Sequence, residues 1–529
     1  MKEYDYVIVG GGTAGSVLAR RLTEDADATV LVLEAGSNYI PSAVNDPSKW
    51  YTLIGSRIDW GYESVPQAQL GGRKVAEPRG KAPGGTSNLY AMIHTRGHPS
   101  DYDNWAYSGA PGWSYANVLP YFKRIETQED PTGPWSGTEG PQRIRNAGRH
   151  SPNPASSAFI DACIELGYPK IDDFSGPDML GSGWHRLDIA DGRRESALVA
   201  YLEPALNRPN LTLRTSAYAT RLLFDGGHCV GVEYQQEPEP IAEEGAGRRI
   251  RSANADAPEV GVHSVRVNSE VLVCAGTMES PKLLMLSGIG PATQLREFDI
   301  PVVVDLPGVG ENFQNHVLVG VVSESTAMVP PPTQNFAEGA MFTASQPGWL
   351  APDLQFAFGH SPFDFIPEGN PNSVTVIPGV MRTFSRGWIR LASTDPLAKP
   401  LINPNYFADR SDLDRLVQGV KIAREIFATN AFLPWFKQEL SPGSDVSSDA
   451  DIANFVRHEA RSYFHHGGSC KMGIDDFAVV DPELRVHGVT GLRVVDASIM
   501  PALPSCNTHT AVLMIAERGS DLIAGVGGG

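Results

Sequence analysis

Long hydrophobic runs, positive charge and cysteine are all scarce in this sequence of 529 residues. No stretch reaches the roughly 18 consecutive apolar residues of a membrane-spanning helix. The 43 Lys and Arg residues are outnumbered by 61 Asp and Glu, and the net charge of −18 argues against nucleic acid or an anionic membrane as a partner. The five cysteines are scattered without a C-x-x-C pair, which predicts reduced thiols and excludes a disulfide framework or a zinc site.

These absences predict a cytoplasmic protein. Tyr4 already lies in the first predicted strand, which leaves no room for a secretory signal peptide. We therefore expect no membrane span, no nucleic-acid partner and no metal site, and we leave the oligomeric state open. The chain is too long for one core, and at about 150 residues per domain its length favours two or three domains.

The first 34 residues carry the strongest local pattern. A short apolar run over residues 4–9 predicts a buried parallel strand, and residues 16–22 and 29–33 predict a helix and a second strand. Between the first strand and the helix, Gly10, Gly12 and Gly15 fit G-x-G-x-x-G. Such glycines bring a pyrophosphate onto the helix N-terminus, and Glu34, at the end of the second strand, would bond a ribose hydroxyl. This order of elements predicts an adenine dinucleotide site.

The rest of the chain changes character twice. Residues 210–214, 221–224 and 230–234 predict strands of a small sheet, and residues 235–263 predict a solvated hairpin insertion. From Glu311 to about Arg457 the sequence shifts to alternating strands with many aromatic residues. It returns to a buried strand at 492–497 and a helix at 510–523. The end of the chain thus returns to the character of its first segment.

Residues 276–290 resemble a signature of the glucose-methanol-choline (GMC) oxidoreductases at every constrained position. Further motifs of the family occur before and after this segment, along almost the whole chain: Pro78-Arg79-Gly80, Arg96-Gly97, Asp101–Trp105, Leu306–Asn312, Ser385-Arg386-Gly387, Pro404-Asn405-Tyr406 and Cys470–Gly473. The resemblance implies an α/β flavoprotein with a Rossmann-like FAD-binding domain and a substrate domain built on a mostly antiparallel sheet with flanking helices. Residues 1–155, 205–310 and 460–529 would form the FAD-binding domain, and residues 156–204 and 311–459 the substrate-binding domain.

The resemblance also implies which residues hold FAD. Carried over position by position, they are Gly10, Gly12, Thr13, Ala14, Gly15, Glu34, Ala35, Gly84, Gly85, Ser87, Asn88, Leu89, Tyr90, Ala219, Asp496, Ala497, His509 and Thr510. Leu89 occupies the position where some members attach FAD through a histidine, so we expect non-covalent FAD.

Alcohol oxidation needs a base, because the hydroxyl proton must leave as hydride passes to the flavin, and histidine suits that role. The segment 462–470 resembles the family motif H-P-V-G-T-C, which implies that His465 is the catalytic histidine. Asn507 falls at the family's second polar position, and His509 remains an alternative for it. The dipole of the helix that starts at Thr510 would stabilise the negative charge of reduced flavin.

The sequence departs from the family pattern at Tyr90, where an Asn is usual, at Pro83, at His466, which replaces the motif's Pro, and at Ala511. Aromatic residues near the predicted site suggest a pocket for a flat or apolar alcohol, with Tyr90, Phe356, Phe358, Tyr463 and His466 as candidates; Phe356 and Phe358 could equally be core residues of the second sheet.

We therefore expect oxidation of a primary, aromatic or hydrophobic alcohol to the aldehyde, with O2 or a quinone-type compound as electron acceptor. Oxidation of a sugar or of an amino alcohol such as choline by the same mechanism stays open. A hydroxynitrile-lyase type of enzyme with non-redox FAD is a more distant alternative, as is a non-catalytic flavin-binding protein.

Overall fold

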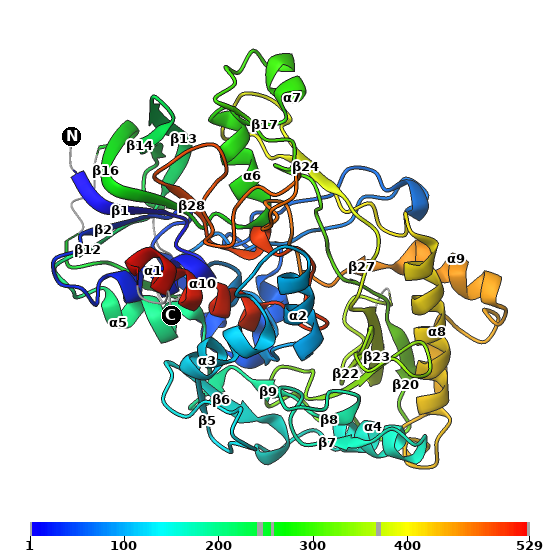
Figure 1. Cartoon of the computed structure of the whole chain (residues 1–529). Coiled ribbons are helices and arrows are strands. Elements are labelled where there is room, and N and C mark those ends of the chain that lie inside the picture. The colour runs from blue at the N-terminus through cyan, green and yellow to red at the C-terminus, as the bar shows by residue number, and fades with distance from the viewer. Residues whose placement is uncertain (1–2, 241–246, 255–258, 367–371, 526–529) are drawn as a thin grey trace.

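A computed structural model describes residues 3–240, 247–254, 259–366 and 372–525. Two large sheets dominate it (Figure 1). The first has seven strands, in the order β12-β2-β1-β16-β14-β13, with β28 also paired to β16. Their bounds are β1 Glu3–Val9, β2 Val30–Leu33, β12 Leu211–Arg214, β13 Ala217–Asp225, β14 His228–Gln236, β16 Gly261–Val273 and β28 Leu492–Val494. The five strands β12, β2, β1, β16 and β28 are parallel, and β14 and β13 complete the sheet in antiparallel pairing.

Helices from the two ends of the chain lie side by side against this sheet, α1 (Thr13–Leu22) and α10 (His509–Ala524) (Figure 1). The carboxylate of Glu517 in α10 is fully buried and accepts hydrogen bonds from Arg21 of α1 and Arg124 of α3 (Tyr115–Ile125). Apolar β1 and β2 residues fill the core beneath the helices. This packing fixes both helix N-termini at one edge of the sheet.

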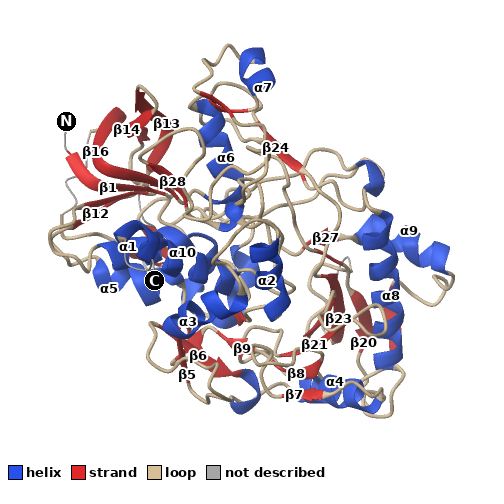
Figure 2. Ribbon diagram, in the orientation of Figure 1, coloured by secondary structure: helices blue, strands red, loops and turns tan. Residues whose placement is uncertain are grey.

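The second sheet has nine strands, in the order β26-β20-β23-β22-β21-β8-β7, with β19 paired to β23 and to β27. The bounds are β7 Lys170–Ile171, β8 Gly181–Trp184, β19 Val317–Leu318, β20 Val321–Glu324, β21 Gly339–Thr343, β22 Leu354–Gly359, β23 Ser373–Val380, β26 Gln438–Ser441 and β27 Arg461–Ser462. All pairs are antiparallel except β7 with β8. Helices α4 (Pro154–Glu165) and α8 (Arg410–Phe427) pack on it, and α9 (Asp449–Glu459) packs on α8 (Figure 2).

Smaller elements connect the two sheets. A four-stranded sheet contains β4 Ile93–His94, β9 Arg186–Leu187, β6 Gln142–Asn146 and β5 Glu126–Gln128. Two-stranded pairs are β3 Tyr39–Pro41 with β15 Gly247–Arg249, β10 Ile189–Ala190 with β11 Arg193–Arg194, β17 Ile289–Gly290 with β18 Val304–Asp305, and β24 Trp388–Arg390 with β25 Leu401–Asn403. The remaining α-helices of the described residues are α2 Pro99–Tyr107, α5 Glu203–Ala205, α6 Gly276–Leu286 and α7 Ala292–Glu297, and short 3-10 or π-helical turns occur between the elements.

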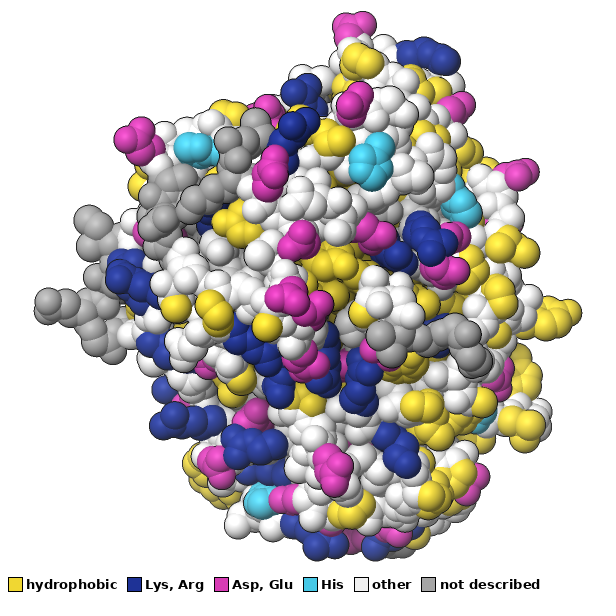
Figure 3. Space-filling model, turned by 60° about the vertical axis from the view of Figure 1, so that its left-hand side comes forward, with side chains coloured by type: hydrophobic (Ala, Val, Ile, Leu, Met, Phe, Trp, Pro, Cys, Tyr) yellow, Lys and Arg dark blue, Asp and Glu magenta, His cyan; other side chains and the backbone are white. Residues whose placement is uncertain are grey.

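The predicted fold class is confirmed, with one correction. The strands expected near 210–234 do not form a small sheet of their own, because β12 pairs with β2 and β14 pairs with β16, so all belong to the seven-stranded sheet. The insertion at 235–263 lies partly outside the described residues, and its described part includes β15, which pairs with β3. Basic and acidic side chains are interspersed over the face shown in Figure 3.

Candidate active site

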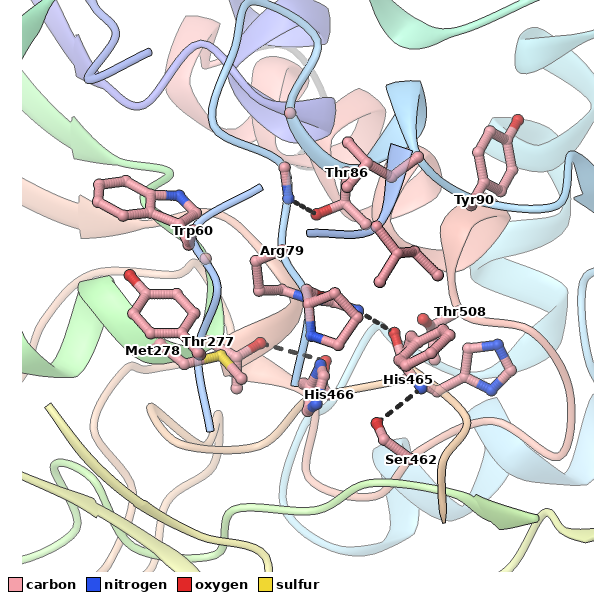
Figure 4. Close-up of a pocket in the computed structure, with 18 of the residues that line it drawn as sticks. Trp60, Arg79, Thr86, Tyr90, Thr277, Met278, Ser462, His465, His466 and Thr508 are labelled. Carbon is pink, nitrogen blue, oxygen red and sulfur yellow. Dashed lines mark hydrogen bonds between the residues drawn. The ribbon is translucent and has the colours of Figure 1, made fainter. Parts of the chain in front are cut away.

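A cavity of about 1170 Å³ runs from the carboxyl ends of β1 and β2 to the second sheet. At one end it is lined by the start of α1, at Gly12 and Thr13, and at the other by Ala357 of β22 and Ser462 of β27. The start of α10 and the segment 463–466 also reach it (Figure 4). Ligands of open parallel sheets bind at this edge of the strands.

Two positions of the glycine-rich loop require glycine, because another part of the backbone lies very close to each of them. Gly10 has φ +102°, and a Cβ at Gly15 would lie 1.9 Å from the carbonyl oxygen of Gly10. A side chain at Gly15 would force α1 away from the end of β1, and one at Gly10 would lie 2.5 Å from the carbonyl oxygen of Cys274, directly after β16. The first turn of α1 therefore starts directly at the end of β1, with Gly12 as an N-cap that offers no side-chain acceptor to the helix amides.

The residues at this end fit FAD. The free amides at the start of α1 suit a pyrophosphate. The buried carboxylate of Glu34 accepts hydrogen bonds from the amides of Gly11 (2.8 Å) and Gly36 (2.7 Å), which hold it at the cavity wall where a ribose would lie. Asp496 is likewise fixed, since it accepts from the amide of Gly276 and the hydroxyl of Ser280.

Most residues predicted to bind the cofactor line this cavity: Gly10, Gly12, Thr13, Ala14, Glu34, Ala35, Gly85, Leu89, Tyr90, Ala219, Asp496, Ala497 and His509. Five others do not line it and instead support its walls: Gly15, Gly84, Ser87, Asn88 and Thr510. Ser87, for example, donates its hydroxyl to the carbonyl of Gly84 and accepts from the amide of Ala197.

His465 and Asn507 face each other in the cavity wall. Nδ2 of Asn507 lies 3.1 Å from Nε2 of His465, and Oδ1 of Asn507 accepts from Nε2 of Gln355 at 3.1 Å. Because Gln355 fixes the amide orientation, Asn507 donates to His465, and Nε2 of His465 is the unprotonated ring nitrogen. Its proton is then on Nδ1, which lies 3.0 Å from Nδ1 of His316.

Burial lowers the pKa of His465 well below its ordinary 6.5, and the neighbouring His316 and Arg79 act in the same direction. The pKa of His316 is lowered to about 3 by burial. Both rings are therefore neutral at physiological pH. The backbone of His465 is held as well, because its amide donates to Oδ1 of Asn315 and Phe464 before it adopts φ +65°. The segment thus presents a neutral imidazole with its lone pair toward Asn507.

A buried chain of polar residues stands behind Tyr90. The hydroxyl of Tyr90 donates to Asp188 at 2.5 Å and points away from the histidines (Figure 4). Asp188 contacts Nδ1 of His94 at 2.9 Å, and Glu126 contacts its Nε2 at 3.0 Å. Although burial opposes it, the two carboxylates raise the pKa of His94 to about 9, so His94 is cationic. The ring of Tyr90 therefore faces the cavity, and its hydroxyl does not. The centroid of this ring lies 4.4 Å from that of the His509 ring.

Among the predicted substrate residues, Tyr90, Tyr463 and His466 line the cavity. Phe356 and Phe358 do not: both are completely buried in the core of the second sheet, where Phe358 stacks on Phe159 at 5.0 Å. The prediction that they wall the pocket is wrong, and the core alternative holds. Side chains alternate along β22, so the residue between them, Ala357, is the one that reaches the cavity.

Four functional neighbours were not found from the sequence: Glu77, Asp188, Asn315 and His316. His316 comes beside His465 because β19 pairs with β27: Val317 lies opposite Ser462, and the carbonyl of His316 accepts the amide of Tyr463. The sequence signal is the polar pair Asn315-His316, which follows the family motif ending at Asn312 after two intervening residues.

The described residues hold neither a metal-ligand cluster nor a membrane-spanning helix. Among the described residues, no three His, Cys, Asp or Glu side chains gather as metal ligands. Within the same ranges, no helix has both the length and the apolar character to cross a bilayer. All five cysteines are buried free thiols.

Comparisons with known proteins agree with this geometry. Sequence models of the GMC oxidoreductases match residues 4–318 and 383–516. The oxygen-dependent choline dehydrogenase of Brucella canis is 38% identical over 551 residues, covering 99% of this chain and 96% of that protein. The crystal structure of pyridoxine 4-oxidase from Mesorbium loti superposes with a TM-score of 0.89 at 32% identity over 98% of each chain. A fungal aryl-alcohol oxidase superposes with a TM-score of 0.83 at 25% identity over 99% of each chain.

Proposed function

Because the chain belongs to the GMC oxidoreductases and is an FAD-dependent enzyme acting on CH–OH donors, we propose that it oxidises a primary, aromatic or hydrophobic alcohol to the aldehyde. The chemistry that FAD supplies when bound is acceptance of a hydride at N5 and delivery of the electrons to O2 or a quinone-type acceptor. The observation that carries the proposal is the neutral His465, with its Nε2 lone pair facing Asn507 in the cavity wall.

In this proposal His465 is the general base. Its Nε2 takes the hydroxyl proton of the alcohol, while Nδ2 of Asn507 donates to the same oxygen. Nδ1 of His465 stays bonded to His316 throughout, which keeps the reactive nitrogen directed at the substrate. We assign no part of this role to His509, because its ring packs against Tyr90 and its Nε2 lies 3.9 Å from Oδ2 of Asp188. The N-terminus of α10 adds a positive potential beside the cavity.

The lining favours an uncharged substrate. Aromatic side chains of Trp50, Tyr51, Phe336 and Phe363 gather at the second-sheet end, with contacts of 5.4 to 6.2 Å between ring centroids. Four of the five carboxylates that line the cavity within the described residues are engaged by protein donors or cations: Glu34, Glu279, Asp364 and Asp496. The fifth, Glu459, is attracted electrostatically by Arg73. Glu459 is therefore the one of these five described carboxylates with which a substrate ammonium could still pair.

An amino alcohol such as choline is the second candidate, because a relative 38% identical over nearly the whole chain is a choline dehydrogenase. Aromatic rings of the lining would then hold the ammonium by cation–π contact. A sugar and the lyase reaction with non-redox FAD are further alternatives.

We propose that FAD is bound non-covalently. Leu89, at the position where some family members attach the cofactor, is a buried apolar residue with no nucleophile to offer. Acid precipitation should release the flavin into the supernatant, and flavin retained in the washed pellet would refute the proposal.

We also propose a cytoplasmic location, supported by the five free thiols, and the domain division at 1–155, 205–310 and 460–529 against 156–204 and 311–459. The described strands of the second sheet fall in the latter ranges except β27, which lies at residues 461–462.

The test is anaerobic mixing of the yellow holoenzyme with benzyl alcohol, an aliphatic alcohol, choline and glucose in separate experiments. Bleaching by benzyl alcohol at the lowest concentration supports the proposed substrate class, and preferential bleaching by choline overturns it. Rapid reoxidation in air identifies an oxidase, and slow reoxidation that a quinone accelerates identifies a dehydrogenase. If no alcohol bleaches the flavin, the redox proposal fails and the lyase alternative gains.

A further inference from the structure

His466 and Glu77 form a buried pair that the proposed mechanism does not use. Nε2 of His466 lies 2.5 Å from Oε2 of Glu77, and both side chains are fully buried. Glu77 is held from two further sides, because Oε1 accepts the hydroxyl of Tyr406 at 2.8 Å and Oε2 accepts Nδ2 of Asn315 at 3.2 Å. A carboxylate fixed in this way orients the imidazole that it contacts.

The other ring nitrogen of His466 has no protein partner. Nδ1 is buried without a hydrogen bond, although the residue lines the cavity. The ring cannot turn away, since it stacks on Phe313 with an interplanar angle of 7°, and the carbonyl oxygen of His466 accepts from Thr277. Figure 4 shows His466 beside Thr277, with the hydrogen bond between them drawn as a dashed line. A buried polar atom without a partner is costly, so this nitrogen indicates a group of a bound ligand.

The protonation state of Glu77 decides whether Nδ1 of His466 is a hydrogen-bond donor or an acceptor. When Glu77 is ionised, Nε2–H of His466 donates to it and Nδ1 is an acceptor. When Glu77 is protonated, it donates to Nε2, and Nδ1 carries a proton. The titratable and charged groups around the pair are Tyr406, Arg79 and His465. Burial raises the pKa of Glu77 to about 8 and lowers that of His466 well below its ordinary value, so the change between the two states falls near pH 8.

We propose that Glu77 and His466 are a second hydrogen-bonding dyad of this cavity, whose Nδ1 binds an oxygen or nitrogen atom of the bound ligand as donor or as acceptor. The dyad is separate from His465 and Asn507, although Asn315 contacts both through its amide group. The atom belongs either to the flavin or to the alcohol. Only this choice of ligands rests on the proposed function.

The test uses the holoenzyme and the variants Glu77→Gln and His466→Phe. Phenylalanine keeps the stack on Phe313 but removes Nδ1. The matched control is Glu338→Gln, a buried carboxylate 3.6 Å from another buried histidine, His360, neither of which lines the cavity. Flavin absorbance and reduction potential without substrate, and KM and kcat for the alcohol, are measured from about pH 6 to 10.

If the flavin is the ligand, the spectrum and potential of the wild type show a transition near pH 8 that both variants lose and the control keeps. If the alcohol is the ligand, the flavin is unaffected, and KM rises about tenfold in His466→Phe with kcat retained, which is the effect of one lost hydrogen bond. The proposal is overturned if both variants bind FAD and neither the flavin properties nor KM changes more than twofold. If the variants fail to fold, the wild-type enzyme alone tests the proposal. Flavin absorbance, reduction potential and KM that all stay constant from about pH 6 to 10 would overturn the proposal. His465→Ala separates the two proposals, since it removes flavin reduction but keeps the dyad's pH transition.

Discussion

His316 should control the rate of flavin reduction without touching the substrate. It does not line the cavity, but its Nδ1 lies 3.0 Å from Nδ1 of His465 and is the acceptor that holds the proton there. In His316→Phe the Nδ1–H of His465 loses its acceptor in a fully buried site. An unsatisfied buried donor costs about 1–3 kcal/mol, and the ring escapes this cost by moving its proton to Nε2, where it can no longer act as a base.

The rate constant of flavin reduction at saturating alcohol should therefore fall about 10- to 100-fold, because each 1.4 kcal/mol is a factor of ten. KM should change little, since the contacts of Asn507 with the alcohol remain. The assay is anaerobic stopped-flow absorbance of the FAD-loaded variant.

The matched control is His185→Phe. His185 is also buried, and burial also lowers its pKa to about 3, but it lies outside the cavity. Its variant should reduce flavin within twofold of the wild type. A His316→Phe enzyme that binds FAD and reduces it within threefold of the wild-type rate would refute the positioning role.

Three further predictions follow from packing and charge. Glu517→Gln should lower the free energy of unfolding by about 1.5–3 kcal/mol in a chemical denaturation, because it removes the charged and fully buried acceptor of Arg21 and Arg124. Asp521→Asn, whose side chain is 25% exposed, should cost at most about 1 kcal/mol, and equal losses would contradict this. Gly85→Ala should weaken FAD binding at least tenfold in reconstitution titrations, since Gly85 has φ +54° and its Cβ would lie 2.7 Å from Cα of Gly12; Gly192→Ala, with φ +72° in open space, is the control that should bind FAD normally. Burial lowers the pKa values of His185 and His316 to about 3 and that of His509 to about 4, so these rings are neutral in the folded protein while the unfolded chain binds protons below about pH 6.5. Stability should then fall as the pH drops from 6.5 toward 4, and melting temperatures that stay constant over that range would contradict this.

The sequence predicts the first part of the site because its determinants are local. The strand, the three glycines and Glu34 lie within one short segment, and the structure places them as the pattern requires. His465 and Asn507 are predicted from family motifs in which the catalytic positions have a fixed spacing from neighbouring residues. Their roles remain proposals, but the structure brings them within hydrogen-bond distance.

The residues that the sequence did not predict have partners that are distant in the chain. Glu77 and His466 are 389 residues apart, and Tyr90 and Asp188 are 98 apart, so only the tertiary fold brings each pair together. The same limit explains Phe356 and Phe358. Alternation along a strand groups them on one face but does not say which face of the sheet meets the cavity.

The central claim is that His465 removes the hydroxyl proton of the alcohol, and His465→Ala tests it most directly. The FAD-loaded variant and wild type are mixed anaerobically with the best alcohol found in the substrate panel, and the bleaching of the flavin is followed. General bases contribute about 10²–10⁴-fold, so the account predicts a fall in the rate of flavin reduction of at least about 100-fold with FAD still bound. A variant that binds FAD and is reduced within about tenfold of the wild-type rate would contradict it.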